Sequence, residues 1–466
     1  MQSVEEGEVL RPMPSFSKNI WRDQFPPTGD LVFDSFTKEI DPLKEKVKDM
    51  LKASTADPIE NVKLIDTLLR LGVSYHFEND IQNQLESIFS SLQSVLVAGN
   101  DLDLNSTSIV FRVFRQYGFK MSCDVFNKFK DIDGKLKEIL IDDAKGMLSL
   151  YEASHLRVHG ECVLEEALAF TTANLNSSAK KFSPLVAKLI TNALDQPLNK
   201  SSPRLAARTY ISFYEEEESR DEPLLKFAKL DFNQVQILHK QEVSQITRDF
   251  YVADDTFDAY GTPQELQRLI DALKIWDISA LDELHDYTKV ICKTVLVVFD
   301  EIAEEARKEG RSYGVPYARD AFIGLVTNYQ AEVKWYHDGI EAFEWQRNDP
   351  KIMQATNVIG RLMNDIVSHK FEQLREHAPS SVECYMKQHN LSEQLTLKAF
   401  EKLLEDAWKD VNEECMRPTC IPRDLLLRHL NFARASYLFY KHGDGYTHPE
   451  YVKDDIRALF VDPIPI

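Results

Sequence analysis

Three aspartates within five residues could bind a divalent cation. Asp254, Asp255 and Asp258 form the pattern Asp-Asp-x-x-Asp. On a helix, positions four apart share a face, so Asp254 and Asp258 would project together and Asp255 would support them. Carboxylates without nearby Cys or His favour Mg²⁺, with Mn²⁺ as the alternative, and Mg²⁺ usually completes its shell with water and substrate phosphates. The pattern alone is equally consistent with a solvated acidic helix face.

A second set of oxygen-bearing residues makes the metal interpretation stronger. Asn364, Ser368 and Glu372 are spaced by four residues and would form one stripe along a helix. An amide oxygen, a hydroxyl and a carboxylate suit a single Mg²⁺. Two such stripes facing each other would hold Mg²⁺ ions. These ions would bind a diphosphate, neutralise its developing charge and let it leave. The remaining allylic cation would need a dry, aromatic pocket.

Composition excludes several other classes of protein. The chain has 466 residues and a net charge of −20, which argues against a nucleic-acid or anionic-membrane surface. No apolar run is long enough to span a bilayer. The acidic N-terminus resembles neither a secretory signal nor a transit peptide, so a cytoplasmic location is predicted. Monomer is the default state.

Other metal-binding residue types do not form a convincing site. Six scattered cysteines indicate reduced thiols, and no histidine at ligand spacing accompanies Cys415 and Cys420. His155 and His159 are predicted to lie four apart on a helix. A metal pair is conceivable there, but a hydrogen-bonded packing pair is favoured.

The pattern of apolar residues predicts an all-α fold. The pairs Asp41-Pro42 and Asp57-Pro58 each open a helix, the second ending near Gly72 with Leu64, Leu68 and Leu71 on its buried side. Further helices are predicted at 79–97, 105–116, 138–149, 162–173, 177–195, 202–220, 224–248, 254–275, 280–309, 313–338, 350–376, 379–389, 392–415 and 422–441. An acidic run at 214–223 marks a domain boundary. Residues 1–30 are expected to be an extended strand packed across a domain.

The motifs together resemble the plant terpene synthases of the cytosolic sesquiterpene group, such as cadinene, germacrene and copaene synthases. The resemblance runs nearly end to end. Its motifs are Arg11-Pro12, Ile20-Trp21, residues 155–161 (HLRVHGE), 212–214 with the Glu run, 254–261 (DDTFDAYG), 361–372, 383–386, 443–447 (GDGYT) and 460–466.

The resemblance implies a fold, a reaction and a set of site residues. The fold would be an N-terminal helical relic α-barrel (31–220) and a C-terminal class I α-barrel (221–466), with 1–30 as a capping strand. The reaction would be Mg²⁺-dependent ionisation and cyclisation of a prenyl diphosphate, farnesyl diphosphate for this group, with three Mg²⁺ ions. The implied metal ligands are Asp254, Asp258, Asn364, Ser368 and Glu372, with Asp255 supporting the shell.

Further roles follow from the same resemblance. Arg361 would reach the diphosphate, and Arg11 would belong to the strand that caps the closed site. Asp444 and Tyr446 would lie on the loop over the cavity mouth as catalytic residues. Phe432, Phe439 and Tyr440 are candidates for the cavity wall, although ordinary helix packing is the more general role of such residues.

The chain departs from the family pattern in two places. Only five residues separate Arg248 from Asp254, where the family has a helix, an Arg-rich diphosphate clamp and an aromatic segment. Residues 334–339 run almost directly into 343–345, where the family has two further helical pieces. Because the barrel would lose wall and floor, the chain could be an impaired paralogue, a splice product or a mispredicted gene product.

Two alternatives to a working cyclase remain. One is a catalytically dead helical protein kept for its interactions, which the missing clamp favours. The other is a prenyl-chain elongating synthase. That class would need a second Asp-rich motif, and the stripe of Asn364, Ser368 and Glu372 stands in its place.

Overall fold

The computed structural model describes most of the chain. The described residues are 33–97, 102–178, 181–255, 268–269, 271–273, 275–276, 281, 284, 286–308, 345–373 and 380–466. Backbone alone is described for some of them, including 241–255 and 371–372. Two compact units are distinguished: a larger one from Gly29–Ile237 and Asp349–Ile466, and a smaller one that includes Leu238–Asn348.

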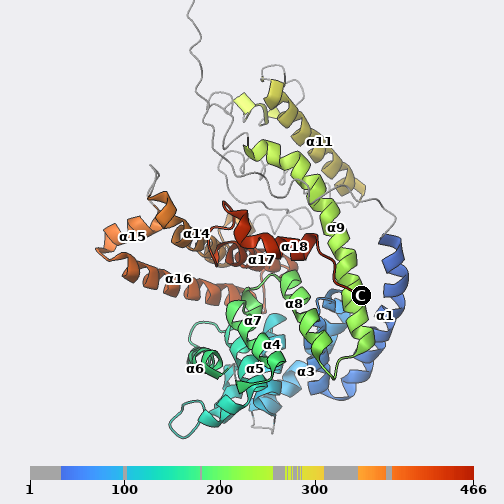
Figure 1. Ribbon diagram of the computed structural model, residues 1–466, viewed down its shortest axis with the longest axis vertical. Helices are drawn as coiled ribbons and strands as arrows, with labels where there is room; N and C mark the ends of the chain where they lie inside the picture. Colours follow the sequence, from blue (N-terminus) through green and yellow to red (C-terminus); the bar gives the residue numbers. More distant parts are fainter. Residues whose placement is uncertain are drawn as a thin grey trace, which may run out of the picture. The chain divides into compact units, whose positions relative to one another are not determined.

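The fold is all-α, as predicted (Figure 1). Within the described residues, the only β interaction is an isolated bridge between Lys130 and Leu136. The first half of the larger unit contains α1 (Phe33–Ala53), α2 (Pro58–Arg70), α3 (Glu78–Val97), α4 (Leu104–Gln116), α5 (Ala144–Ser154), α6 (Cys162–Ser178), α7 (Pro184–Asp195), α8 (Pro203–Glu216) and the start of α9 (Glu222–Asp255). Its second half contains α14 (Lys351–Glu372), α15 (Ser381–His389), α16 (Glu393–Glu414), α17 (Arg423–Tyr440) and α18 (Lys453–Phe460).

Helix α2 illustrates how local sequence sets the elements. The side chain of Asp57 accepts hydrogen bonds from the backbone N–H groups of Ile59 (2.9 Å) and Glu60 (3.3 Å), and Pro58 occupies the first turn. Leu68 and Leu71 are buried as predicted. Replacing the cap with alanine should cost about 0.5–2 kcal/mol.

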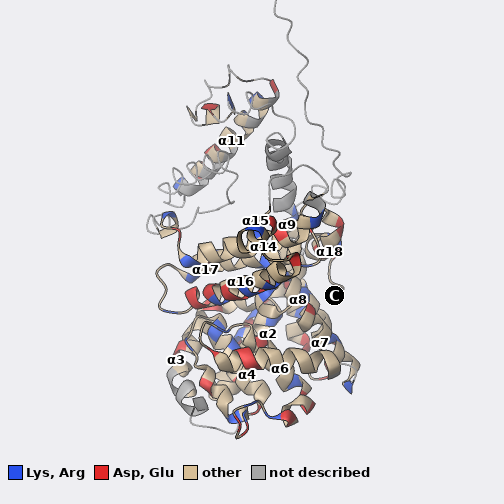
Figure 2. Ribbon diagram, turned by 90° about the vertical axis from the view of Figure 1, so that its left-hand side faces the viewer, with Lys and Arg blue, Asp and Glu red and all other residues tan. Residues whose placement is uncertain are grey.

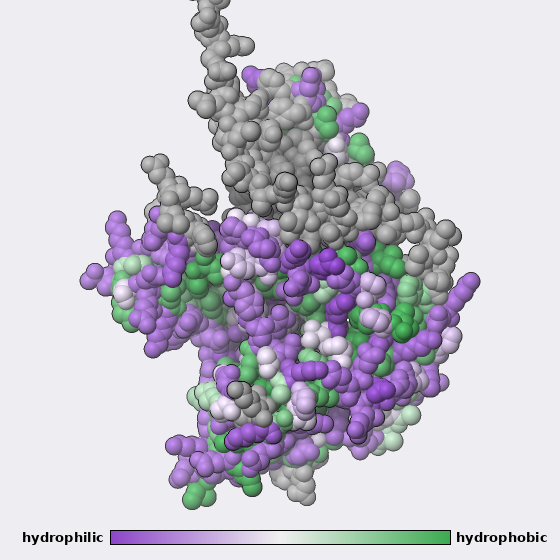
Figure 3. Space-filling view, in the orientation of Figure 1, coloured by the Kyte–Doolittle hydropathy of each residue, from purple (hydrophilic) through white to green (hydrophobic). Residues whose placement is uncertain are grey.

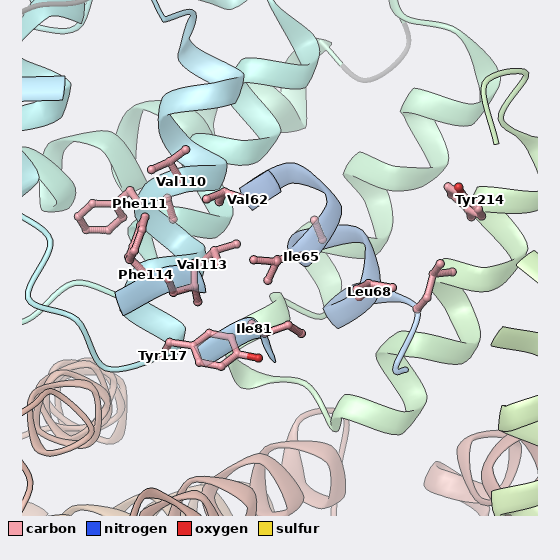
Figure 4. Packing of buried hydrophobic residues seen from close by; sticks show 14 of the residues in the cluster. Val62, Ile65, Leu68, Ile81, Val110, Phe111, Val113, Phe114, Tyr117 and Tyr214 are labelled. Atoms are coloured by element: carbon pink, nitrogen blue, oxygen red, sulfur yellow. The ribbon is translucent and has the colours of Figure 1, made fainter. Parts of the chain in front are cut away.

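The core of the larger unit draws on all the helices of its first half, from α1 to the start of α9. Figure 4 shows part of it, with labelled residues from α2, α3, α4 and α8. Phe111, Phe114 and Tyr117 are at most 1% exposed, and the rings of Phe111 and Phe126 meet edge to face at 5.2 Å. Truncating one of these phenylalanines to alanine should cost about 3–5 kcal/mol. Hydrophilic residues cover much of the visible face of this unit (Figure 3).

Several predicted helix bounds were wrong. Helix α1 begins at Phe33 and contains Pro42, so the Asp41-Pro42 pair does not open it. The predicted helix at 138–149 is a 3₁₀ turn (Glu138–Asp142) followed by α5, because Asp143 caps α5 by accepting from Gly146 N–H at 2.9 Å. The predicted helix at 177–195 is α7, which begins at Pro184. Helix α18 lies in a tail for which no helix was predicted.

Helix α9 corrects a more important expectation. The sequence predicted separate helices at 224–248 and 254–275, whereas α9 runs without a break from Glu222 to Asp255. Between Leu224 and Asp255 there is neither Gly nor Pro to end a helix. The first departure from the family pattern therefore lies inside one continuous helix. The predicted helix at 313–338 lies outside the described residues.

The smaller unit has a small core of its own. Helix α11 (Asp286–Lys308) contributes Cys292, Val295 and Phe299 to it. The ring of Phe299 meets that of Trp276 edge to face at 4.9 Å. Seven buried residues form this core among the part of the smaller unit that is described.

Candidate functional site

Helix α14 carries the predicted Asn364 and Ser368 and packs against α16 and α17. Gly360 makes the close approach to α17 feasible, because a Cβ there would lie 3.2 Å from Ser436 Oγ and 3.4 Å from a ring carbon of Phe432. Leu362 is buried with Val382 and Phe400 on the other side of α14. The helix is thus held between two partners, which fixes where its polar residues point.

Asn364 lies beside the end of α17. Its side chain hydrogen-bonds the hydroxyl of Tyr440, and Arg361 and Asp444 also act electrostatically on that hydroxyl. Burial raises the pKa of Tyr440, and the Asp444 carboxylate raises it further, while Asn364 and Arg361 oppose the shift. Four residues that the sequence analysis placed at the site therefore lie close together, on α14 and at the C-terminal end of α17.

Ser368 has the environment expected of a metal ligand. It is 7% exposed, and its Oγ has no hydrogen-bond partner among the described residues. A buried hydroxyl normally finds a partner, so an orphaned one needs an explanation. A hard cation held jointly with the amide oxygen of Asn364 would supply it. The residues present therefore fit Mg²⁺.

Asp365 is a residue that the sequence analysis missed. It is buried, its Oδ1 lies 3.2 Å from Arg361 Nε, and its Oδ2 accepts a 2.9 Å hydrogen bond from the backbone N–H of Ser381. Arg361 itself is 69% exposed. Asp365 thus lies within ion-pair distance of the guanidinium and ties α14 to the start of α15. The spacing of four between Arg361 and Asp365 was the available signal.

Asp444 and Tyr446 lie in a turn after α17. Asp444 Oδ1 accepts from the backbone N–H groups of Tyr446 (3.1 Å) and Thr447 (3.0 Å). Gly443 has φ +147° and its Cβ would lie 3.0 Å from the Tyr451 ring, so a larger residue would be strained and would have to displace that ring. These contacts fix the conformation of the turn, in which Tyr446 is 69% exposed.

The structure describes the other predicted site residues only in part. Asp254 and Asp255 are the last two residues of α9, and Glu372 is the last residue of α14; their backbone alone is described. Asp258 and Arg11 lie outside the described residues.

The predicted wall residues are placed on α17. Phe432 is 47% exposed and lies against Gly360. The backbone carbonyl of Phe439 accepts from Gly445 N–H at 2.9 Å. Tyr440 belongs with Asn364, as described above. These contacts account for all three residues as packing or site neighbours.

The two histidines of the HLRVHGE motif do not share a helix, contrary to the prediction. Helix α5 ends at Ser154 and His155 is its C-cap. His159 Nε2 lies 2.8 Å from Asp410 Oδ1 on α16. Burial, with Lys200 and Arg157 nearby, lowers the pKa of His155, so its ring is neutral at pH 7.

This motif joins the two halves of the larger unit. Arg157 pairs with both Glu165 and Glu405, and Lys200 adds a 3.2 Å contact to the same Glu405. Asn412 donates 2.9 Å hydrogen bonds to the carbonyls of His155 and Arg157. In the ribbon of Figure 2, acidic and basic residues are interspersed along α16. The motif's role in the described residues is structural.

Comparison with known families decides the assignment. The terpene synthase N-terminal domain matches residues 17–194, and the terpene synthase family metal-binding domain matches 242–340 and 339–410. The chain belongs to the plant terpene synthase family. It is therefore a class I terpene synthase, a Mg²⁺-dependent lyase that ionises a prenyl diphosphate.

Several named relatives align with this terpene synthase over almost its whole length. It is 40% identical to probable terpene synthase 6 of Ricinus communis, covering 99% of this chain and 100% of the relative. It is 42% identical to the chloroplastic casbene synthase of Ricinus communis (100% and 91% covered) and 38% identical to valerianol synthase TPS1B of Camellia hiemalis (99% and 98%).

A solved structure agrees in fold. Isoprene synthase from grey poplar, in complex with three Mg²⁺ ions and dimethylallyl-S-thiolodiphosphate, superposes with a TM-score of 0.80 at 26% identity, covering 94% of this chain and 99% of that one.

The comparisons also bear on the departures. The alignment with probable terpene synthase 6 spans 556 positions, whereas this terpene synthase has 466 residues, so at least 90 aligned positions have no counterpart in it. The metal-binding domain matches in two segments that meet at 339–340, beside the second departure. The chain thus lacks internal sequence that its relative has.

No helix in the described ranges is both long and apolar enough to cross a membrane.

Proposed function

We propose that this terpene synthase acts on farnesyl diphosphate and cyclises the resulting cation. The observation that carries the site assignment is Ser368, whose buried Oγ lacks a partner among the described residues one turn from Asn364. Together with the resemblance to the cytosolic sesquiterpene group, this supports a C₁₅ substrate. We further propose that the protein is cytoplasmic, which a fluorescent fusion in leaf cells would check. We propose that it is a monomer, which light scattering would check.

The proposed roles of the residues are as follows. Asn364, Ser368 and Glu372 hold one Mg²⁺, and Asp254 and Asp258 hold the others with Asp255 in support. Metal ions held there would supply the positive charge that stabilises the diphosphate as it departs with the electron pair of its C–O bond. Arg361, oriented by Asp365, binds the same anion as a fixed cation. Arg11, Asp444 and Tyr446 close the site against water.

The proposed domain boundary lies between α8 and α9. Helix α8 ends at Glu216 and α9 begins at Glu222. Residues 31–220 would be the N-terminal helical domain, 221–466 the metal-binding domain and 1–30 the capping strand. Expression of residues 31–220 alone tests the boundary, since an independent domain gives a cooperative melting transition.

A second candidate is a metal-binding chain with no turnover. The fused helix α9 favours it, because the family's arginine clamp would precede the Asp-rich motif and α9 leaves no loop there. A diphosphate without that clamp would be held by the metals and Arg361 alone.

The decisive experiment compares substrates and two chains. The purified protein is incubated with Mg²⁺ and farnesyl, geranyl or geranylgeranyl diphosphate, and the volatiles are identified by gas chromatography and mass spectrometry. A cyclic C₁₅ product from farnesyl diphosphate is expected. If only a chain with both missing segments restored yields product, the second candidate holds. Product from geranylgeranyl diphosphate alone would refute the C₁₅ substrate.

The Asp254→Ala variant checks the metal assignment. It should abolish turnover, because a carboxylate proposed to hold Mg²⁺ is lost. Turnover retained at the wild-type level would remove Asp254 from the site.

A further inference from the structure

The larger unit encloses a cavity that the reaction does not use. Its volume is about 250 Å³. It lies between helices of the first half (α2, α4, α8) and helices of the second half (α16, α17). None of the proposed metal or diphosphate residues lines it. At about 30 Å³ per water in the liquid, it has room for roughly eight waters or a small organic molecule.

The wall of the cavity is apolar with an excess of cations. Its apolar residues include Leu69, Leu156, Leu198, Met416, Leu427 and Leu430. Four arginines line it (Arg70, Arg115, Arg423 and Arg434) against one carboxylate, Glu78. A buried cation without a counter-charge is costly, so the partner of each arginine matters.

Two of the four arginines have their carboxylate. Arg115 pairs with Glu161 and donates to the carbonyl of Met121 at 2.8 Å. Arg423 pairs with Glu78 at 3.2 Å. These two charges are balanced within the protein.

Neither Arg434 nor Arg70 forms an ion pair with a carboxylate among the described residues. Arg434 donates to two neutral oxygens, the carbonyl of Asn199 and Oδ1 of Asn431, both at 2.9 Å. Burial lowers the pKa of Arg434 to about 10. The guanidinium of Arg70 stacks on the ring of Tyr210 at 3.9 Å, and its buried Nε has no hydrogen-bond partner.

The charge of Arg70 is nevertheless compensated. Tyr210, Asp66, Glu152 and Glu217 all attract it, and together they outweigh burial, so the pKa of Arg70 is raised. Glu152, whose own pKa burial raises to about 7, also accepts from the N–H of Leu198 at 2.8 Å. Arg434 has no carboxylate among the groups that act on it, so an anion entering the cavity would meet uncompensated positive charge there.

We propose that this cavity binds an amphipathic organic anion, a carboxylate or phosphate monoester on a short apolar tail, with Arg434 as its cationic partner. The leucines and Met416 accept the tail. Charge-assisted hydrogen bonds from guanidinium groups in a desolvated site give the acidic group its preference. Because the cavity joins the two halves of the larger unit, binding there stabilises their junction.

Hexanoate, hexyl phosphate and inorganic phosphate serve as probes. Calorimetry is done on the full-length protein with EDTA, so that no metal-dependent diphosphate site contributes. Hexanoate and hexyl phosphate should bind and raise the melting temperature. Stronger binding of one identifies the acid class. Binding of inorganic phosphate alone, or equal binding of hexanol or hexylammonium, would overturn the proposal.

Variants locate the site. Arg434→Met should weaken hexanoate binding about tenfold or more, equivalent to 1.4 kcal/mol. Arg204→Met is the matched control, because Arg204 also donates to a backbone carbonyl (Phe232, 2.9 Å) and burial also lowers its pKa, but it does not line the cavity. Leu427→Trp, which fills the cavity and keeps Arg434, should abolish binding. Unchanged affinity in both Arg434→Met and Leu427→Trp would refute the assignment, and circular dichroism verifies that each variant is folded.

Discussion

Ser368 is the described residue on which the metal assignment depends. Its Oγ is buried without a partner in the part of the chain that the structure describes, so removing the hydroxyl should not lower stability. Ser368→Ala should raise the Mg²⁺ concentration for half-maximal turnover at least about tenfold, by analogy with the loss of other groups at metal sites. The melting temperature should stay within about 2 °C of wild type.

Ser154→Ala is the matched control for that variant. Ser154 is also buried, but its Oγ donates to the carbonyl of Leu150 at 2.6 Å. Its loss should leave the Mg²⁺ requirement unchanged. If the protein has no turnover, Mn²⁺ binding measured by electron paramagnetic resonance replaces the kinetic readout. Equal Mn²⁺ affinity in wild type and Ser368→Ala would contradict the assignment.

Glu152 gives a prediction about pH. Burial raises its pKa from 4.5 to about 7 in the folded protein. The folded state therefore binds more protons than the unfolded state between these values, and this group lowers stability as pH rises through them. Glu152→Gln removes the effect and keeps an acceptor for Leu198 N–H.

The test of Glu152 is the difference between two proteins at two pH values. Relative to wild type, Glu152→Gln should gain about 1–3 kcal/mol of unfolding free energy from pH 5 to pH 8. Urea unfolding at both pH values measures it. Parallel stability curves for the two proteins would show that Glu152 is ionised at little cost.

At the residue scale, the sequence predicted the candidate metal ligands better than the tertiary contacts of the residues around them. Asn364 and Ser368 were predictable, because a spacing of four puts oxygen atoms on one side of a helix. The spacing of four also indicated the Arg361–Asp365 pair, but not the hydrogen bond that Asp365 accepts from Ser381 of another helix. The tertiary partner of His159, Asp410, is 251 residues away, and no local pattern encodes such a contact.

At the scale of the element, helix starts were predictable where the capping chemistry is local. Asp57-Pro58 was correct, whereas the same pair at Asp41-Pro42 lies inside α1. The fusion of two predicted helices into α9 follows from the absence of Gly and Pro, which the family pattern obscured.

The junction of α4 and α16 yields a prediction at this scale. Gly118 has φ +80°, and a Cβ on it would lie 2.7 Å from the backbone carbonyl oxygen of Cys415. Gly118→Ala would meet both backbone strain and this clash. Gly134 has φ +77° with nothing within 4 Å, so Gly134→Ala meets strain alone.

The two alanine variants separate the two costs. Gly134→Ala should lose about 1–2 kcal/mol, the usual cost of a left-handed residue with a side chain. Gly118→Ala should lose at least about 1 kcal/mol more, because Arg417 N–H also donates to the Gly118 carbonyl at 2.7 Å and must move with it. Chemical denaturation of both measures the difference, and equal losses would mean that the junction adapts freely.

At the scale of the whole molecule, the all-α class and the family were predictable from the motifs, because each motif is local and their order is fixed. The consequence of the missing segments was not. A sequence pattern registers that residues are absent but does not say how the remaining helices repack, as α9 illustrates.

Helices α4 and α11, one from each unit, differ in how much of their apolar surface is buried, and this predicts their local stability. In α4, 10 of 13 residues are buried. In α11, Val290 and Val297, seven positions apart and so on one side of the helix, are 63% and 47% exposed. Amide hydrogens of α11 should therefore exchange at least about a hundredfold faster than those of α4. Hydrogen exchange with mass spectrometry measures both helices in one experiment.

Restoring the two missing segments should slow exchange in α11 and leave α4 unchanged, since the added helices belong to the domain that contains α11. Equally slow exchange of α11 and α4 in the chain as it stands would mean that the missing segments are not needed for a stable barrel.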